Sequence, residues 1–293
     1  MNIVILSRGP GLYSTQRLVH EGQQRGHNIR VIDHFRCSIV VEKDKPQVYY
    51  GDERIQSIDA IVPRIGASVT TQGAAIIRHF EMMNVFSPVS SEALLRSRDK
   101  LRCLQILAMA GLGVPKTVFT DFTQDISHLI DSVGGLPVVI KLLEGTHGLG
   151  VILAESRNTA ESIIESFYRL KESIIIQEFI KESRGTDVRV FIINGEIIAA
   201  MKRVAPPGEF RSNLHRGASA LPVQLTQAEV DTALKAVNVL GLDVAGVDIL
   251  QSERGPLILE VNPSPGLEGI SRVTDVNIAA EIFKFVEETV KRK

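Results

Sequence analysis

Two acidic side chains and an amide in the last sixth of the chain form the set with the clearest chemistry. Asp248 lies in one apolar stretch and Glu260 in the next, and the polar residues 251–256 between them are typical of a hairpin connection. If the hairpin is centred on Arg254, the two acids lie directly opposite each other, with Cβ atoms roughly 4.5–5.5 Å apart. Asn262 projects from the same strand face as Glu260. Paired carboxylates repel unless a cation lies between them, and oxygen-only ligands suit magnesium.

The alternative is a pair of solvent-facing acids on an edge hairpin. The flanking residues argue against it, because both stretches are almost continuously apolar. They comprise Val247, Ile249, Leu250, Leu257, Ile258, Leu259 and Val261. We therefore expect the acids in a buried or covered environment, where an unpaired charge is costly and a metal ion is the simplest compensation.

A glycine-rich segment, residues 144–150, joins two strand-like stretches and is suited to holding phosphate. Its glycines let backbone N–H groups close over phosphate oxygens, although a plain glycine-rich hairpin has the same composition. Lys141 lies on the stretch that enters the segment, where its ammonium group would reach the same phosphates. No Gly-Lys step occurs anywhere, so this is not a Walker P-loop. Residues 9–14 lack the third glycine of the dinucleotide fingerprint, which makes a dehydrogenase the weaker alternative.

Basic side chains form another cluster. Lys202 and Arg203 are adjacent, and residues 210–217 follow in a segment rich in proline and glycine. Because the polar types in this segment are varied and able to hydrogen-bond, a binding role is favoured over a solvated loop. His215 by itself is more typical of a structural histidine.

The composition is that of a globular protein. A formal net charge of −1 over 293 residues gives no overall field that would attract nucleic acid or anionic lipid. Cys37 and Cys103 lie in apolar stretches, which fits reduced core thiols better than a disulfide or a zinc site. No apolar run approaches about 18 residues, and the first residues lack the basic flank of a signal peptide. We therefore expect a cytoplasmic protein without a membrane segment.

The order of strand-like and helix-like stretches predicts three lobes, at residues 1–92, 93–176 and 177–293. The first is expected to be a small parallel α/β lobe that begins with a βαβ unit. Expected helices cover residues 14–25, 74–83, 99–110, 159–170, 227–240 and 278–290. Expected strands cover residues 3–6, 29–32, 48–50, 58–62, 138–142, 151–154, 174–179, 188–193, 197–201, 247–250 and 257–261.

The chain resembles the ATP-grasp superfamily in an ordered series of segments that spans about two-thirds of its length. These are Lys141, residues 144–150, 177–180, 187–189 and 211–217, Asp248, and residues 260–266. Within the superfamily it is similar to the RimK-type ligases, and this similarity extends into the first lobe at residues 5–8 and 62–66. The resemblance implies an α/β chain with the α+β ATP-grasp fold. A Rossmann-like N-terminal lobe would precede two α+β lobes that sandwich ATP.

The resemblance also implies the roles of individual residues. At the nucleotide these are Lys100, Lys141, Gly145, Thr146, Gly148 and Gly150 for the phosphates, Glu178 and Phe179 for adenine, Asp187 for ribose, and Arg211, Ser212 and Asn213 to complete the site. Asp248, Glu260 and Asn262 would hold two magnesium or manganese ions. The candidates for catalytic groups that grip an anionic intermediate or acidic substrate are Arg189, Lys202, Arg203 and Arg216, with Arg64 as a further one from the first lobe.

The implied activity is ATP- and magnesium-dependent ligation of a carboxylate to an amine through an acyl phosphate. RimK-type ligases add L-glutamate to the C-terminal glutamate of the sixth small-subunit ribosomal protein, and formation of poly-α-glutamate is a related outcome. Similar enzymes act on a coenzyme or a carrier protein, so these acceptors are the alternative. A non-enzymatic ATP-binding regulatory module is disfavoured by the intact acid set. The resemblance further implies a homotetramer without direct contact to nucleic acid or membrane.

Overall fold

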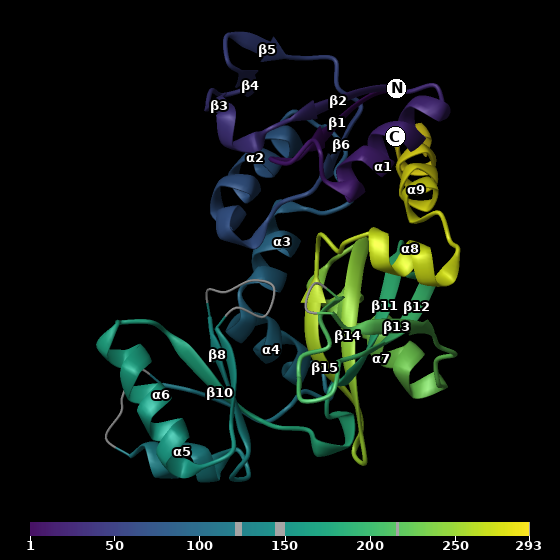
Figure 1. Cartoon of the computed structure of the whole chain (residues 1–293). Helices are drawn as coiled ribbons and strands as arrows, with labels where there is room; N and C mark the ends of the chain where they lie inside the picture. The colour runs from purple at the N-terminus through teal and green to yellow at the C-terminus, as the bar shows by residue number, and fades with distance from the viewer. Residues whose placement is uncertain (121–124, 144–149, 215–216, 293) are drawn as a thin grey trace.

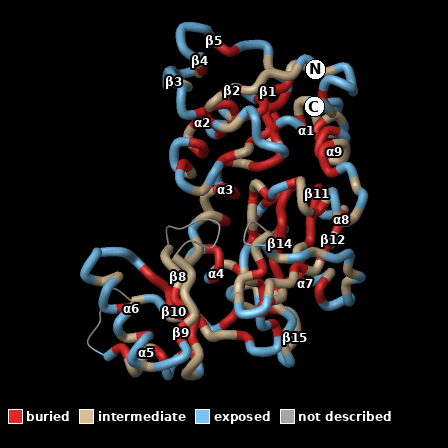
Figure 2. Tube along the Cα trace, viewed as in Figure 1, coloured by how far each residue is buried: buried red, intermediate tan, exposed pale blue. Residues whose placement is uncertain are grey.

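The chain folds into three lobes that each combine helices with a sheet (Figure 1). The computed structural model describes residues 1–120, 125–143, 150–214 and 217–292. In Figure 1 the first lobe lies at the top, the middle lobe at the lower left and the last lobe at the lower right. Buried residues concentrate on the strands and on the inner faces of the helices in each lobe (Figure 2).

The first lobe is built on the predicted βαβ unit. β1 lies at the centre of a parallel sheet with the order β2-β1-β6. Its residues Ile3 to Leu6 are fully buried, as is usual for a parallel strand that helices cover. The elements are β1 (Asn2–Leu6), α1 (Tyr13–Gln24), β2 (Asn28–Ile32), β6 (Ala60–Pro63) and α2 (Thr70–Met82).

The strand expected at residues 48–50 does not join this parallel sheet. It is β4 (Gln47–Tyr50), the middle strand of an antiparallel meander with β3 (Cys37–Val40) and β5 (Glu53–Ile55). The links between these strands are too short for the crossover that a parallel pair requires, so only hairpins are possible. The expectation of a purely parallel lobe was therefore wrong.

Two consecutive helices connect the first lobe to the rest of the chain. Asp99 separates α3 (Ser91–Arg98) from α4 (Lys100–Met109), and its side chain caps α4 by accepting a hydrogen bond from the Arg102 N–H at 3.0 Å. This confirms the helix predicted to begin near Asp99. The predicted lobe boundary between residues 92 and 93 falls inside α3.

The middle lobe has a hydrophobic core of its own, separate from the core of the other two lobes. Its sheet has the order β7-β10-β8-β9, with every neighbouring pair antiparallel. Ile140 of the sheet and Ile164 of a covering helix are both fully buried in this core. The elements are β7 (Thr117–Phe119), α5 (Ile126–Ser132), β8 (Val138–Leu142), β9 (Val151–Ala154), α6 (Arg157–Arg169) and β10 (Ile174–Glu178).

The last lobe carries a five-stranded antiparallel sheet with the order β13-β12-β11-β14-β15. α7 packs on this sheet, and it starts with a capping box in which Thr226 and Glu229 satisfy each other's backbone N–H groups. The strands are β11 (Thr186–Ile193), β12 (Glu196–Val204), β13 (Ser219–Pro222), β14 (Val244–Ser252) and β15 (Gly255–Asn262). The helices are α7 (Gln227–Leu240), α8 (Glu268–Thr274) and α9 (Ile278–Arg292).

The final helix leaves the last lobe and packs on α1 of the first (Figure 1). Arg25 binds the carboxylate of Glu287 through two hydrogen bonds of 2.7 Å, and His27 contacts the same carboxylate at 2.7 Å. The predicted third lobe, residues 177–293, therefore ends in a helix that contacts the first lobe as well as β11 of the last. Within the described part of the chain, no helix has both the length and the apolar character needed to cross a bilayer.

Replacing Glu287 by Gln should lower the stability of the protein near neutral pH by about 1 kcal/mol, or roughly 2–4 °C in Tm. The hydrogen bond from Arg25 lowers the pKa of Glu287 to about 2, whereas an unfolded glutamate has a pKa of about 4.3. The stabilisation is thus present above the unfolded value and is lost as the pH falls toward 2.

The difference in Tm between the wild type and Glu287→Gln should shrink between about pH 6 and about pH 3. Thermal denaturation at both pH values measures it. Glu288→Gln, which changes the exposed neighbouring acid, is the control. An undiminished difference at low pH would contradict the assignment.

Candidate active site

Asp248 and Glu260 pair directly across β14 and β15, which confirms the predicted juxtaposition. The turn of the hairpin, however, is not centred where the sequence predicted it. Ser252 pairs with Gly255 around a two-residue turn, and an irregularity after Asp248 restores the register. Only Asp248 is buried, with 4% of its surface exposed, whereas Glu260 is exposed. The expectation that both acids are covered was therefore half wrong.

Two arginines surround the buried carboxylate of Asp248. Arg189 donates to both of its oxygens, at 2.7 and 2.6 Å, and Arg203 donates to one of them at 2.7 Å. The register explains the first contact, because Arg189 lies opposite Asp248 across β11 and β14. Burial opposes the charge on Asp248, but the two guanidinium groups lower its pKa below the usual value. In this structure arginines compensate a charge for which the sequence predicted a metal ion.

Arg203 extends this network to a second buried acid. It lies opposite Asp187 across β11 and β12 and donates to both oxygens of that carboxylate, at 2.6 and 2.5 Å. Arg203 is 3% exposed and Asp187 is 2% exposed. Burial raises the pKa of Asp187 despite Arg203, and Ser212 adds a hydrogen bond. The guanidinium group of Arg203 is committed to two carboxylates, so its contribution to a site would be to position them.

Lys202, the neighbour of Arg203, lies on the other face of the sheet. Its ammonium group contacts Gln251 at 3.3 Å, and Gln251 in turn donates to Glu229 of α7. Successive residues of a strand point to opposite faces, so Lys202 and Arg203 cannot both line one site. The structure thus places Lys202 away from the acid set, against its predicted catalytic role.

Two lysines converge where β8 ends. Lys141 Nζ donates to Oε1 of Gln177 at 2.5 Å, and Lys100 Nζ donates to the carbonyl of Leu143 at 2.5 Å. Burial lowers the pKa of Lys141 to about 8, Glu260 opposes this shift, and Lys100 adds to it. Lys141, Lys100 and the exposed acid of the β15 strand are therefore in electrostatic reach of one another. A ligand that carried several negative charges would relieve the repulsion between the lysines.

The residues predicted to hold adenine lie at the hinge between the middle and last lobes. Glu178 accepts hydrogen bonds from the Lys116 N–H at 2.6 Å and from Arg254 at 2.5 Å. Phe179 meets Phe210 edge to face, with ring centroids 6.5 Å apart. This segment thus places an aromatic pair next to Glu178, whose Oε1 already accepts two hydrogen bonds from the protein. The role of these residues in binding adenine stays a prediction.

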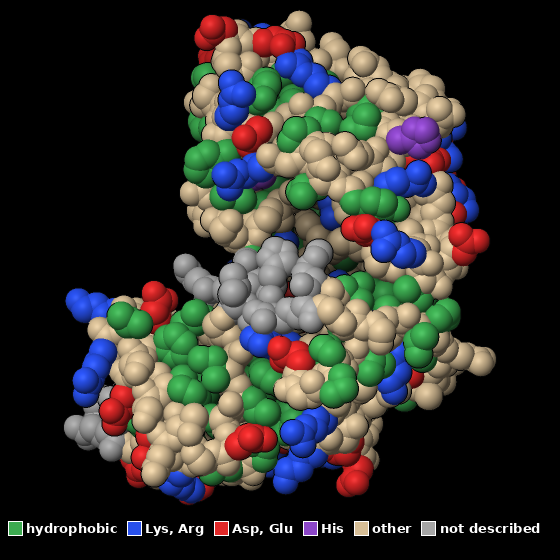
Figure 3. Space-filling view, viewed as in Figure 1, with side chains coloured by type: hydrophobic (Ala, Val, Ile, Leu, Met, Phe, Trp, Pro, Cys, Tyr) green, Lys and Arg blue, Asp and Glu red, His purple; other side chains and the backbone are tan. Residues whose placement is uncertain are grey.

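A pocket of about 620 Å³ opens between β9 and the segment that carries Arg211. Arg211 donates to the carbonyl of Val151 at 3.3 Å, stacks over Phe210, and pairs with Glu209 at 2.7 Å. The hydrogen bond from Arg211 lowers the pKa of Glu209 to about 2. Arg211 therefore links the middle lobe to the last lobe. Elsewhere on the surface, Figure 3 shows a hollow between the first lobe and the two lobes below it.

Some residues of the predicted nucleotide and substrate site lie outside the described part of the chain, and others lie within it. Gly145, Thr146, Gly148 and Arg216 lie outside the described residues. Gly150 follows with a φ of +71°, which favours glycine. Ser212 is buried, and Asn213 is partly buried beside it.

The acid set contains two carboxylates and one amide. The Oδ1 atom of Asn262 accepts a hydrogen bond from the Ser264 N–H at 3.0 Å, which orients the amide. Across the residues that the structure describes, no three His, Cys, Asp or Glu side chains gather in a metal-binding group. A metal ion held by Asp248, Glu260 and Asn262 would depend on the amide oxygen as its third protein donor.

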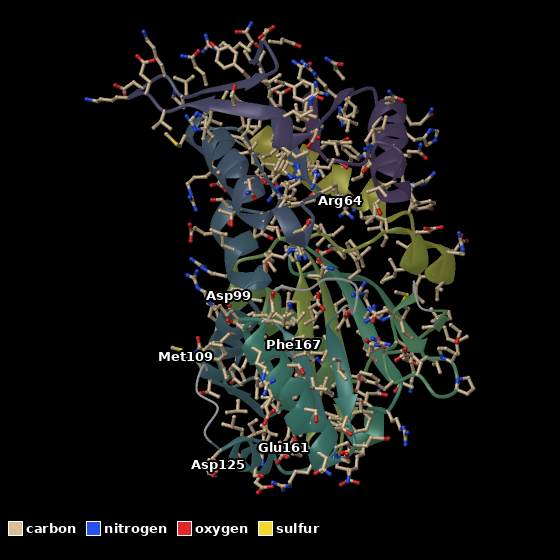
Figure 4. The ribbon with its side chains drawn as sticks, turned by 60° about the vertical axis from the view of Figure 1, so that its left-hand side comes forward. Arg64, Asp99, Met109, Asp125, Glu161 and Phe167 are labelled. Atoms are coloured by element: carbon tan, nitrogen blue, oxygen red, sulfur yellow. The ribbon has the colours of Figure 1, made fainter. Side chains whose placement is uncertain are left out.

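The first lobe and the connecting helix α3 each contribute an arginine to this region, and the sequence predicted only the first of them. Arg64 donates to the carbonyl of Pro265 at 2.7 Å, and Arg98 donates to the carbonyl of Ile65 at 2.9 Å. Figure 4 shows Arg64 where the first lobe faces the last. Arg98 belongs to no recognisable sequence motif. It lies in this region because α3 packs against β15, and that packing is not visible in the sequence.

Family models match nearly the whole chain. One described as the RimK-like ATP-grasp domain matches residues 97–286, and one described as the RimK PreATP-grasp domain matches residues 1–94. A "Probable alpha-L-glutamate ligase" of Aliivibrio fischeri (strain MJ11) is 54% identical over 293 residues, which is 100% of this chain and 97% of that protein. A "Probable alpha-L-glutamate ligase 1" of Hahella chejuensis (strain KCTC 2396) is 53% identical with the same coverage.

Solved structures confirm the predicted fold. The ATP-grasp ligase PsnB, complexed with precursor peptide PsnA2 and AMPPNP, superposes with a TM-score of 0.75 at 19% identity, over 99% of this chain and 98% of that one. The D-alanine–D-alanine ligase of Bacillus anthracis, complexed with ATP, gives a TM-score of 0.70 at 17% identity, over 100% of this chain and 98% of that one. The described architecture is therefore the ATP-grasp fold.

Replacing Arg203 by Ala should destabilise the protein by about 3–5 kcal/mol, because it leaves the buried carboxylate of Asp187 without its counter-charge. Arg189→Ala should cost less, because its guanidinium group is more exposed and Asp248 keeps the other arginine. Urea denaturation of the two variants measures the order. Arg184→Ala, which removes a charge that is 69% exposed, is the control. Equal stability of the Arg203 and Arg184 variants would overturn this account.

Proposed function

The chain belongs to the RimK-like ATP-grasp family of ATP-dependent ligases, and we propose that it joins L-glutamate to the C-terminal glutamate of a protein acceptor. One observation carries the proposal. Glu260 of β15, which pairs with Asp248 of β14, lies in electrostatic reach of Lys141. Such a combination suits a polyphosphate and the cation that accompanies it.

ATP would lie between the middle and last lobes. Lys100 and Lys141 would place positive charge against its phosphates at the end of β8. The glycine-rich residues 144–150 come soon after β8 in the sequence. Phe179 and Phe210 would border the adenine, and Arg211 would close the side of the pocket. Asp187, held by Arg203, would present a fixed carboxylate to the ribose.

Asp248, Glu260 and Asn262 fit magnesium, or manganese, because all three offer oxygen donors and the two acids face each other. We propose two ions in this set. When bound, magnesium supplies positive charge that neutralises the phosphate oxygens during transfer. Arg189 keeps the carboxylate of Asp248 ionised and oriented, which is a positioning role.

The reaction would proceed in two substitutions. An oxygen of the acceptor's terminal carboxylate bonds to the γ-phosphorus, and ADP leaves with the electron pair of the broken P–O bond. The amine of glutamate then bonds to the acyl carbon, inorganic phosphate leaves, and the amine releases protons to solvent. The chain's contribution is mainly to position the reactants and to stabilise negative charge.

The relatives' names support glutamate as the amino acid, and the peptide bound to PsnB supports a peptide acceptor. We propose the sixth small-subunit ribosomal protein as the acceptor, with poly-α-glutamate as a further product. A coenzyme or a carrier protein is the alternative acceptor. We also propose that the enzyme acts in the cytoplasm as a homotetramer, in keeping with the resemblance to RimK-type ligases.

Phosphate release from ATP and magnesium, measured with glutamate alone and then with a peptide that ends in glutamates, tests the proposal. Mass spectrometry should show the peptide gaining steps of one glutamyl mass. The same peptide with a C-terminal amide is the control, because its terminal carboxylate is blocked while its side-chain carboxylates are unchanged. Phosphate release with an unchanged peptide would reject the protein acceptor, and no release in any mixture would reject ligation.

Glu260→Gln should reduce the ligation rate by about 100-fold or more, because it removes a charge that the phosphoryl transfer needs. Part of the loss should be recovered at higher magnesium concentrations. Glu253→Gln changes an exposed acid on the turn of the same hairpin and should leave ligation unchanged. Full magnesium-dependent activity in Glu260→Gln would refute the metal assignment.

A further inference from the structure

Arg64 and Arg98 differ from the other arginines of the region in what they bind. Arg189 and Arg203 are paired with Asp187 and Asp248. Among the described residues, neither Arg64 nor Arg98 forms an ion pair, and each donates only to a backbone carbonyl. Both are partly buried. Two cations without a carboxylate partner thus face the last lobe from the first.

Buried polar atoms at this junction also lack partners. The Nε atom of Arg98 is buried without a hydrogen bond, and so is the hydroxyl of Ser264, which adjoins the Pro265 whose carbonyl Arg64 holds. Within the described chain the other atoms of this kind are the two ring nitrogens of His34. Buried polar groups are nearly always satisfied, so unsatisfied donors here indicate a ligand that accepts hydrogen bonds.

The electrostatics agree with an anionic ligand. Burial lowers the pKa of Arg64 to about 10, and the charge of Arg98 contributes to the shift. Arg64 therefore stays charged at neutral pH, and the two guanidinium groups repel each other. Glu260 acts on the charge of Arg98, which places Arg98 beside the acid set that the proposed reaction uses. A guanidinium group presents a planar fork of donors that matches a carboxylate.

We propose that Arg64 and Arg98 together bind a carboxylate of a glutamate substrate, a role that rests on the proposed ligase activity. That carboxylate belongs either to the free amino acid or to the terminal residue of the acceptor. Both sources offer the same chemistry.

Steady-state kinetics of Arg98→Gln distinguish the two sources. The KM for L-glutamate is measured at saturating peptide, the KM for the peptide at saturating glutamate, and the KM for ATP with both in excess. Loss of a charged hydrogen bond costs about 1.5–3 kcal/mol. The KM of one glutamate source should therefore rise about 10- to 100-fold, with little change in the KM for ATP.

Arg98→Lys keeps the charge without the fork, so its KM should lie between those of the wild type and Arg98→Gln. Arg96→Gln is the matched control, because Arg96 lies on the same helix and its guanidinium group lies near Gly241. If Arg98→Gln does not fold, as judged by thermal denaturation, Arg98→Lys and Arg64→Lys carry the test.

Two results would overturn the proposal. One is unchanged KM values for both glutamate and peptide in variants that fold. The other is a rise in the KM for ATP alone, which would assign the pair to the nucleotide. Failure of the ligase proposal itself would be seen separately, as a wild type that modifies no acceptor.

Discussion

The burial of a charged Asp248 on a central pair of strands is the constraint on which the rest of the site depends. An ionised carboxylate in that position requires close counter-charges, and Arg189 of β11 and Arg203 of β12 supply them. This arrangement in turn commits Arg203 to Asp187, so that three strands of one sheet are joined by side chains as well as by backbone hydrogen bonds. Glu260, exposed on the neighbouring strand β15, is left in electrostatic reach of Lys141 in the middle lobe.

The cations of the region consequently divide into two groups. Those of the last lobe are neutralised inside the protein, and they hold acids in place. Those that come from the first and middle lobes contact backbone carbonyls or an amide, as Arg64, Arg98 and Lys141 do. A substrate with many negative charges would bind to the second group of cations. Its binding site would therefore include residues from more than one lobe.

Local sequence patterns predicted much of the fold, because apolar runs and turn residues mark most of the strands and helices. The pairing of Asp248 with Glu260 was predictable from hairpin geometry, although the irregularity that makes it possible was not. Strand alternation places Lys202 and Arg203 on opposite faces of the sheet, which is visible in the sequence alone. The partners of Asp248 and the place of Arg98 depend on which strands and helices become neighbours, and a single sequence carries no such pairing information. The meander around β4 was missed because strand propensity does not reveal strand direction.

The packing of α9 on α1 bears on how the chain is made. Arg25 and Glu287 are 262 residues apart in sequence, and Phe283 of α9 packs near Gly22 and His27 of the first lobe. During synthesis at about 5–20 residues per second, that face of α1 stays uncovered for tens of seconds. The middle lobe has a separate core and can fold while the chain is still growing, whereas the first lobe is completed only after α9 has been synthesised.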